Sequence, residues 1–243
     1  MKSAEEFFSA AEDKQNSGEY GEAIELYMSA AEKFQASDLE KCAVAYAKAG
    51  ILLELVQRNV EASECLSRAV AILEKLGLKD ERFSFYCSHL GFNYFVQENY
   101  GKAAESYVSA AEIYMKVNSL RNAAENYWRA GFSYKQQADY QSAEECYLKA
   151  LNLCEVSGDK YQQAVVLGLL GILYGDAMKR YEEAASMYLK SGELFKELGD
   201  MNEARDKYVW AFQSYLIAGK VDTAEKLMLS INKIFPENNN YYI

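Results

Sequence analysis

Small and large apolar positions alternate along the chain with the period of an α-helix, and this alternation recurs about every 40 residues. In one copy Ala143 is followed by Tyr147 and then by Ala150, at steps of four and three residues. Such steps place the side chains on one helix face, where small residues let another helix approach and large ones fill the space. The alanine that marks each copy recurs at intervals of 39, 41, 40, 41 and 40 residues, at Ala23, Ala62, Ala103, Ala143, Ala184 and Ala224. The pattern predicts six copies of one helical unit.

A second apolar stripe precedes the first and contains a glycine in four copies. The glycines occupy one position of the stripe, at Gly50, Gly91, Gly131 and Gly171. A glycine in the middle of a helix costs about 1 kcal/mol relative to alanine, so its recurrence predicts that a neighbouring backbone packs against it. Each unit is therefore expected to be a hairpin of two antiparallel helices. One copy is longer, because Gly171 lies ten residues before Tyr181 rather than nine, and we expect YGDAMK at 174–179 to form an ordinary hairpin turn.

These features predict an all-α fold, a right-handed solenoid of about six antiparallel helical hairpins in which each hairpin contacts mainly its neighbours. The only proline, Pro236, leaves the helices uninterrupted. Polar breaks such as LGLKDE and VSGDKY separate the units, and their Ser, Asn or Asp residues can cap the next helix. No break is long enough to link separate domains. We expect a single repeat domain over residues 1–236 and a short polar tail over residues 237–243.

The order of apolar, small and aromatic positions closely resembles that of the tetratricopeptide repeat over nearly the whole chain. The fourth copy shows it most clearly, at Tyr127, Gly131, Tyr134, Tyr140, Ala143, Tyr147 and Ala150. The units here are longer than the roughly 34 residues common in that family, and they lack the proline that usually ends its second helix. The resemblance implies a helical-repeat protein that binds other proteins.

Longer repeats without proline resemble those of the soluble NSF attachment proteins, the SNAP family. The similarity is strongest over residues 171–204, which include the extra residue before Tyr181 and the run YEEAASMYLKSGELF. This resemblance implies a protein that grips a helical bundle of SNARE type in vesicle fusion and recruits an associated ATPase. Phe7 and Phe8 are similar to a pair that contacts the membrane in that family, so peripheral membrane contact is one expectation. They also lie within the first helical stripe, where core packing is the expected role.

Composition and charge exclude several other classes of protein. The formal net charge is −10 and the isoelectric point is near 4.8, which argues against a surface that follows nucleic-acid phosphates. No apolar run reaches the roughly 20 residues that span a bilayer. The first residues, MKSAEEFFSAAEDK, carry carboxylates where a secretory signal needs an apolar segment. The five cysteines are odd in number and lie within helical patterns, which favours reduced, packed thiols. We therefore expect a cytoplasmic protein.

The search for catalytic chemistry nominates no active site. The chain has one histidine, His89, at a position that Lys48 and Arg129 take in other units, so we interpret it as a polar helix residue. A single histidine cannot build a histidine-based metal cluster, and no glycine-rich phosphate loop occurs. We expect no enzyme activity, no cofactor and no metal.

The resemblance to tetratricopeptide repeats implies that the first helix of each hairpin lines the concave surface. Positions outside its packing stripe are then candidates for contact with a partner, and many of them are apolar. The candidate partner-binding residues are Phe92, Phe95, Trp128, Phe132, Lys135, Lys48 and Arg129. An apolar row of this kind has three explanations, which are a groove for a partner segment, a row buried between tightly wound hairpins, and a homodimer interface.

Two functional hypotheses follow. The first is a non-enzymatic adaptor that holds a helical or extended partner segment on its concave face, with a SNAP-like role in handling SNARE complexes as its most specific form. The alternative is a structural subunit whose apolar row closes a homo-oligomer or docks into a larger assembly.

Overall fold

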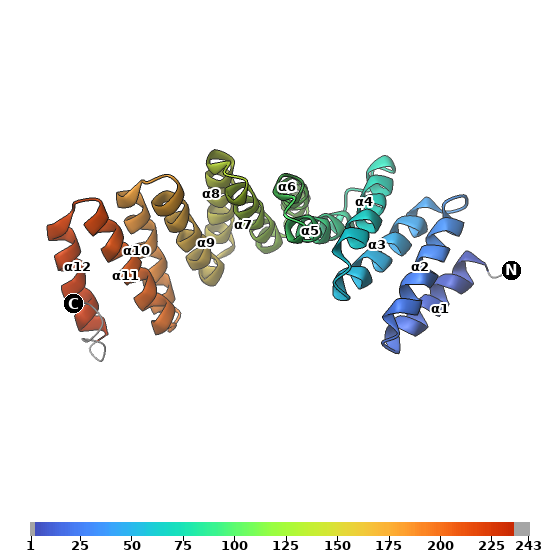
Figure 1. The fold of residues 1–243 in the computed structure, drawn as a ribbon, viewed down its shortest axis with the longest axis horizontal. Coiled ribbons are helices and arrows are strands. Elements are labelled where there is room, and N and C mark those ends of the chain that lie inside the picture. The colour runs from blue at the N-terminus through green and yellow to red at the C-terminus, as the bar shows by residue number, and fades with distance from the viewer. Residues whose placement is uncertain (1–2, 236–243) are drawn as a thin grey trace. The chain divides into compact units, whose positions relative to one another are not determined.

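The computed structural model describes residues 3–235, and this part of the chain is built from helices joined by short turns (Figure 1). The α-helices are Ala4–Asn16 (α1), Tyr20–Phe34 (α2), Leu39–Leu55 (α3), Asn59–Lys75 (α4), Glu81–Val96 (α5), Tyr100–Lys116 (α6), Leu120–Gln136 (α7), Tyr140–Ser157 (α8), Lys160–Ile172 (α9), Tyr181–Glu197 (α10), Met201–Ile217 (α11) and Val221–Ile234 (α12). A π-helix, Leu173–Ala177 (η1), continues α9. The predicted all-α class, with two helices in each repeat, is confirmed.

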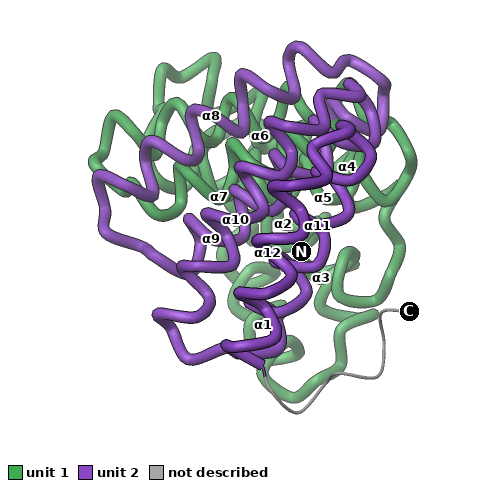
Figure 2. The backbone as a smooth tube through the Cα atoms, turned by 90° about the vertical axis from the view of Figure 1, so that its left-hand side faces the viewer, with its two compact units in different colours: residues 1–133 green, residues 134–243 purple. Residues whose placement is uncertain are grey.

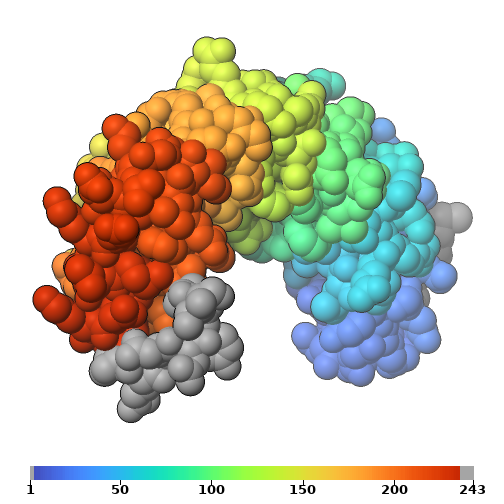
Figure 3. Space-filling model, turned by 60° about the vertical axis from the view of Figure 1, so that its left-hand side comes forward, coloured from blue at the N-terminus to red at the C-terminus, as the bar shows by residue number. Residues whose placement is uncertain are grey.

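The chain divides into two compact units, residues 1–133 and residues 134–243 (Figure 2). In the first unit the successive helices α1 through α6 pack against one another in chain order. In the second unit the successive helices α8 through α12 do the same. In the second unit α11 lies between α10 and α12 and packs against both, and Figure 3 shows this part of the chain as a surface that runs from orange to red. A single repeat domain over residues 1–236 stays a prediction, and the expected polar tail at 237–243 lies outside the described residues.

The repeated alanines form the centre of each hairpin. All six marker alanines, from Ala23 to Ala224, have no exposed surface. The large residues that follow them are buried in the first five copies, as in Tyr27, Leu66 and Tyr107, and half-buried at Met228 in the sixth. Burying an aromatic or leucine side chain contributes about 1.5–3 kcal/mol each, so this stripe supplies a large part of the stability of every repeat.

The repeated glycines explain how the two helices of a hairpin come together. A Cβ atom added to Gly91 would lie 2.9 Å from ring carbons of Tyr107, and one added to Gly171 would lie 2.5 Å from the ring of Tyr188. At Gly50 the nearest atom is Cγ of Leu66, at 2.8 Å. The expected contact with a neighbouring backbone occurs at Gly50, where the Ala62 carbonyl oxygen lies 3.2 Å from the added Cβ atom, but the nearest contact at all three glycines is a side chain. A large side chain from the second helix occupies the space that a Cβ atom would need.

The turn expected at residues 174–179 is also different in the structure. Residues Leu173–Ala177 form a π-helix, in which hydrogen bonds span one residue more than in an α-helix. A π-helix of this kind takes up one inserted residue, and this hairpin is the one with an extra residue between Gly171 and Tyr181. Because the insertion is absorbed inside the helix, the ring of Tyr188 still packs on Gly171.

Helix starts and turns follow local backbone chemistry. The predicted caps are confirmed at Asp38, Asp80, Asp159 and Asp200, whose side chains accept hydrogen bonds from backbone N–H groups of the first helical turn. The turn after each first helix has a left-handed residue two positions before the second helix, at Gly18, Gln57, Glu98, Ala138, Lys179 and Gly219. Four of these six residues are not glycine, so they adopt a conformation that is costly for a residue with a Cβ atom.

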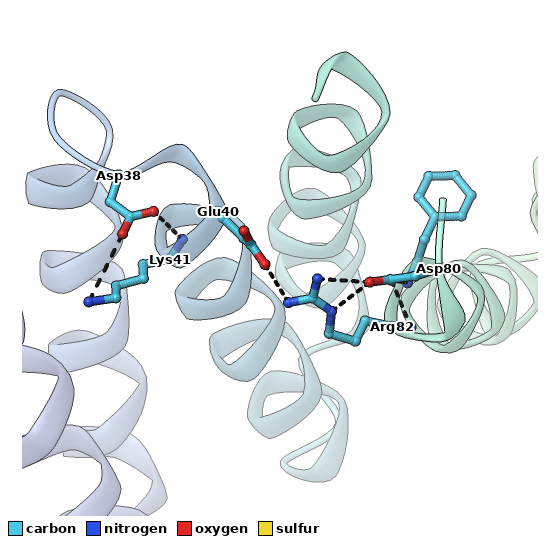
Figure 4. A network of polar contacts seen from close by, with 6 residues as sticks. Asp38, Glu40, Lys41, Asp80 and Arg82 are labelled. Carbon is cyan, nitrogen blue, oxygen red and sulfur yellow. Dashed lines mark hydrogen bonds and ion pairs between the residues drawn. The ribbon is translucent and has the colours of Figure 1, made fainter. Parts of the chain in front are cut away.

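Ion pairs connect neighbouring repeats along the surface. Arg82 at the start of α5 contacts Glu40 at the start of α3, with 2.7 Å between Nη1 and Oε1, and it also pairs with Asp80 at 2.8 Å (Figure 4). Lys41 pairs with Glu5 of the preceding repeat in the same way. These groups are exposed, so each pair contributes at most about 1 kcal/mol, and their main effect is to fix the register of adjacent first helices. Within residues 3–235, no helix combines the length and apolar character needed to cross a membrane.

The glycine contact predicts that Gly91→Ala destabilises the protein by about 1–2 kcal/mol, because the new methyl group would overlap the Tyr107 ring. The matched control is Gly21→Ala in α2, where nothing lies within 4 Å of the added Cβ atom. This control should be neutral or stabilising by up to about 1 kcal/mol. Urea denaturation followed by circular dichroism measures both. Equal effects of the two substitutions would contradict the contact.

The left-handed turn predicts that Glu98→Gly stabilises the protein by about 0.5–1 kcal/mol, since the φ angle of Glu98 is 58°. The substitution Glu98→Ala removes the same side chain but keeps a Cβ atom, so it should leave the midpoint of thermal unfolding nearly unchanged. A stabilisation by alanine as large as that by glycine would show that the side chain, and not the backbone, causes the strain.

Candidate partner-binding groove

A groove opens in the first unit across the first helices of three successive repeats. It has a volume of about 480 Å³ and is lined mainly by α3, α5 and α7. We name it the α5 groove, and its lining residues are Glu54, Phe85, Ser88, His89, Phe92, Tyr114, Asn122, Glu125, Asn126 and Arg129. A volume of this size accommodates a few side chains of a bound segment.

Two phenylalanines supply the apolar surface of the α5 groove. The side chain of Phe85 is 45% exposed and that of Phe92 is 38% exposed. They lie seven residues apart on α5, and therefore on the same face of that helix. The Phe85 ring meets the imidazole of His89 edge to face, with 4.4 Å between ring centroids. The Phe85 ring is thus held by a neighbouring side chain, and both phenylalanines are available to a ligand.

A carboxylate orders one side of the α5 groove. The two oxygens of Glu54 lie 3.0 and 3.1 Å from Nδ1 of His89. Asn93, which is fully buried, donates from Nδ2 to Glu54 at 2.6 Å and to the His89 carbonyl at 2.8 Å. A histidine oriented by a carboxylate can act as a base, but the nearby Ser88 hydroxyl donates to Oδ1 of Asn126 at 2.6 Å. This arrangement positions polar groups and activates no nucleophile.

Arg129 orders the other side of the α5 groove. Its Nη2 atom lies 2.5 Å from Oε1 of Glu125 on the same helix. Its guanidinium carbon lies 5.6 Å from the centroid of the Trp128 ring and 5.9 Å from that of Tyr107. The half-buried Arg129 is therefore held by a carboxylate and two aromatic rings. The groove carries both signs of charge, with Glu54 and Glu125 as its acidic residues.

The predicted binding residues fall into different environments. Phe92 and Arg129 line the α5 groove. Phe95 and Phe132 pack on each other with 5.6 Å between ring centroids, and both are half-buried, as is Trp128. Phe95 and Phe132 therefore pack between repeats, and all three aromatic residues are less exposed than Phe92.

The two predicted lysines do not line the α5 groove. Lys48 pairs with Glu12 at 3.1 Å, and its ammonium lies 5.5 Å from the ring centroids of Phe8 and Tyr27. It is thus directed at the preceding repeat. Phe8 packs edge to face on Tyr27, with 5.3 Å between centroids, as the core interpretation of Phe8 predicted. Lys135 is half-buried in the last turn of α7.

Sequence reasoning missed the polar lining of the α5 groove. Glu54 lies 35 residues before His89, and Ser88 lies 38 residues before Asn126. Both separations are close to the length of one repeat, so these pairs occupy neighbouring first helices. Polar residues that face each other one repeat apart are a signal that could have identified them.

The cysteines are packing residues. All five, Cys42, Cys65, Cys87, Cys146 and Cys154, are buried and unpaired. Burial raises the pKa of the Cys87 and Cys154 thiols to about 12 and that of Cys146 to about 11. A thiol with such a pKa is almost entirely protonated at neutral pH and is a poor nucleophile. Among the described residues, no group of three or more histidine, cysteine or acidic side chains is arranged to hold a metal ion.

These features of the repeats and of the α5 groove can be compared with known protein families. Residues 122–197 match the tetratricopeptide repeat family. This segment includes the second half of the α5 groove, with Glu125, Asn126 and Arg129. The match favours a scaffold for protein interaction over an enzyme. No curated protein matches the chain.

Solved structures of low sequence identity share the fold. BtubC (BKLC) of P. vanneervenii is 19% identical, with a TM-score of 0.61 over 100% of this chain and 95% of its own. A tetratricopeptide repeat protein of Parabacteroides merdae is 18% identical, with a TM-score of 0.61 over 95% of this chain and 79% of its own.

A signal transduction ATPase with numerous domains from Pyrococcus horikoshii has a tetratricopeptide repeat sensor. It is 20% identical, with a TM-score of 0.63 over 98% of this chain and 36% of its own. The chain thus spans about a third of that protein. These structures support the predicted repeat fold, whereas the comparisons do not support the resemblance to the SNAP family.

The buried thiols predict a loss of stability at alkaline pH. The unfolded chain releases thiol protons near pH 8.5 or so, whereas Cys87 keeps its proton in the folded state up to a pKa of about 12. The protonated Cys87 thiol therefore makes its full contribution to the free energy of unfolding below the unfolded pKa. That contribution is lost as the pH rises toward 12, at up to about 1.4 kcal/mol per pH unit. Urea denaturation at pH 8, 9, 10 and 11 or so measures this loss.

The variant Cys87→Ala should be less stable than the wild type at neutral pH but should lose less stability between about pH 9 and 11. The control Leu90→Ala, also on α5 and buried, removes apolar volume without a titrating group. Its difference from the wild type should be constant with pH. A constant difference for Cys87→Ala as well would contradict the role of the thiol.

Proposed function

We propose that the protein is a non-enzymatic interaction scaffold that binds a segment of another protein in the α5 groove. The observation that carries the proposal is the exposure of Phe85 and Phe92 on one face of α5, inside a groove whose polar side chains already contact one another. Aromatic side chains commonly dominate the energy of protein interfaces. The match of residues 122–197 to the tetratricopeptide repeat supports the same class of function.

The chemistry of the α5 groove favours a protein ligand over a nucleic acid. Arg129 is neutralised by Glu125 in part, and Glu54 adds a negative charge. The phosphates of a nucleic acid would be repelled by this charge and by the net charge of −10. A peptide segment can instead place an apolar side chain on Phe85 and Phe92, while the ordered amides and charged groups meet its polar atoms.

The more specific forms of this function rest on the sequence alone. A SNAP-like role would require a SNARE-type helical bundle as the partner, an associated ATPase, and a cytoplasmic location with peripheral membrane contact. Binding of a purified SNARE bundle to the α5 groove would support this role, and failure of that bundle to compete with an identified partner segment would count against it.

A structural subunit that closes a homo-oligomer is the alternative. It is favoured by the exposure of Leu55 and Val96 near the ends of α3 and α5. Light scattering over a range of protein concentrations separates the two functions. A stable monomer supports the adaptor, and an oligomer that Phe92→Ala dissociates supports the subunit.

The proposal predicts that the double variant Phe85→Ala, Phe92→Ala loses its partner. Partners cross-linked to the wild type in native lysate are identified by mass spectrometry, and the bound segment is then made as a peptide and titrated calorimetrically. We expect the double variant to bind it at least roughly 30-fold more weakly, since each lost aromatic anchor costs about 1 kcal/mol or more.

The matched control is Val60→Ala, which removes an exposed apolar side chain from the second helix of a repeat. It should bind the peptide as the wild type does. Circular dichroism should show the same helix content in all three proteins. Unchanged affinity in a folded double variant would rule out the α5 groove as the binding site.

A further inference from the structure

The second unit contains a separate groove beside the π-helix. It has a volume of about 370 Å³, and we name it the η1 groove. Asp176 of η1 lines it together with Tyr181 and Tyr188 of α10 and Trp210 of α11, and Gln213 and Ile217 continue it along α11. Its lining differs from that of the α5 groove, because Asp176 is the one charged residue among those that line it, beside three aromatic residues.

Two aromatic rings of the η1 groove, those of Tyr188 and Trp210, contact each other edge to face. The rings of Tyr188 and Trp210 have centroids 5.5 Å apart and planes at 67°. Trp210 is 37% exposed, whereas Tyr188 is buried below it. The face of a tryptophan ring attracts cations more strongly than that of any other side chain. The Lys207 ammonium already lies 4.1 Å from the Trp210 ring centroid, but Lys207 lines the adjoining hollow and not the η1 groove.

Asp176 brings an uncompensated negative charge to these rings. It is exposed, and no hydrogen bond or ion pair to its carboxylate occurs in the described part of the chain. Several other acidic groups of this unit have basic partners, as Glu182 has in Lys220 at 3.2 Å and Glu144 has in Arg180 at 2.8 Å. Burial raises the pKa of Tyr188, and the charge of Asp176 raises it further, which places that carboxylate near the phenol.

The π-helix is the local reason for this arrangement. The residue inserted between Gly171 and Tyr181 is absorbed in Leu173–Ala177, so the helix carries Asp176 in a segment that has no equivalent in the other repeats. A π-helical turn inside an α-helix is rare and is often found at functional sites. This π-helical turn holds an unpaired carboxylate beside aromatic rings, which favours a ligand-binding role.

We infer that the η1 groove binds a cationic side chain, an arginine or lysine, that belongs to a segment of a partner protein. The Asp176 carboxylate accepts charge-assisted hydrogen bonds from the guanidinium or ammonium, while Tyr181 and Trp210 supply aromatic contact. The inference rests on the proposed function in that the ligand is a protein segment, but it concerns a different groove. It names a basic residue as one feature of that segment.

The test uses the full chain and blocked tripeptides, acetyl-Ala-Arg-Ala-amide and acetyl-Ala-Lys-Ala-amide, with the glutamine tripeptide as the uncharged reference. The chain has two tryptophans, and the variant Trp128→Phe assigns their two indole N–H signals in NMR spectra. We expect the basic tripeptides to shift the Trp210 signal saturably, with a dissociation constant on the order of millimolar, and the glutamine tripeptide to leave it unchanged.

Asp176→Asn should weaken binding of the arginine tripeptide about tenfold, because charge-assisted hydrogen bonds are roughly twice as strong as neutral ones. The matched control Asp206→Asn removes another exposed carboxylate from the second unit and should have no effect. Equal weakening by both variants, or equal shifts with all three tripeptides, would overturn the inference. A small quaternary amine, tetramethylammonium, that binds more tightly than either basic tripeptide would also overturn it in favour of a free amine ligand.

These results separate the two proposals. If Asp176→Asn has no effect on the tripeptides while Phe85→Ala, Phe92→Ala still loses its partner peptide, the η1 inference fails and the proposed function stands. If the tripeptide results are as expected but the double variant keeps its partner, the cation site stands and the α5 groove is not the binding site.

Discussion

The contact between a glycine on the first helix of a repeat and a large side chain on the second is the constraint on which the repeats depend. Gly91 receives the Tyr107 ring and Gly50 receives Leu66, because neither glycine has a Cβ atom in the way. This contact fixes both the distance and the register of the two helices, and the buried alanines beside it keep the helices close. The fold tolerates an inserted residue only where the contact survives. In the longer repeat the insertion becomes a π-helix, and Tyr188 still packs on Gly171.

Once the two helices of a repeat are in register, the first helices of adjacent repeats face one another. Their polar residues then meet one repeat apart, as Glu54 meets His89 and Ser88 meets Asn126. Such contacts are individually weak where they are exposed. Their value for function is geometric, because they hold the side chains around Phe85 and Phe92 before any partner binds, which lowers the entropy cost of association.

The two grooves differ in how their charges are satisfied. In the α5 groove, the charges of Glu54 and Arg129 both have partners within the chain, so the exposed phenylalanines are its main surface free for a ligand. In the η1 groove, Asp176 has no such partner and lies beside Trp210. The first groove therefore suits an apolar anchor, and the second suits a cation. The first helices α3, α5 and α7 supply most of the α5 groove, whereas the η1 groove is lined by the π-helix, the second helix α10 and the first helix α11.

The sequence by itself determined the repeat, the helices and the core. The alanine at Ala143 recurs in all six copies, and a large apolar residue such as Tyr147 follows it four positions later. Only a helix places these residues on one face, where they can be buried together. It also placed Phe92 and Arg129 outside the packing stripe of first helices, and both line the α5 groove. Only the tertiary structure decided that Lys48 is directed at the preceding repeat, that Phe95 packs on Phe132, and that residues 173–177 form a π-helix. These outcomes depend on contacts between residues about one repeat apart or on a choice among hydrogen-bond patterns of similar energy, and neither is encoded in the local spacing of apolar residues.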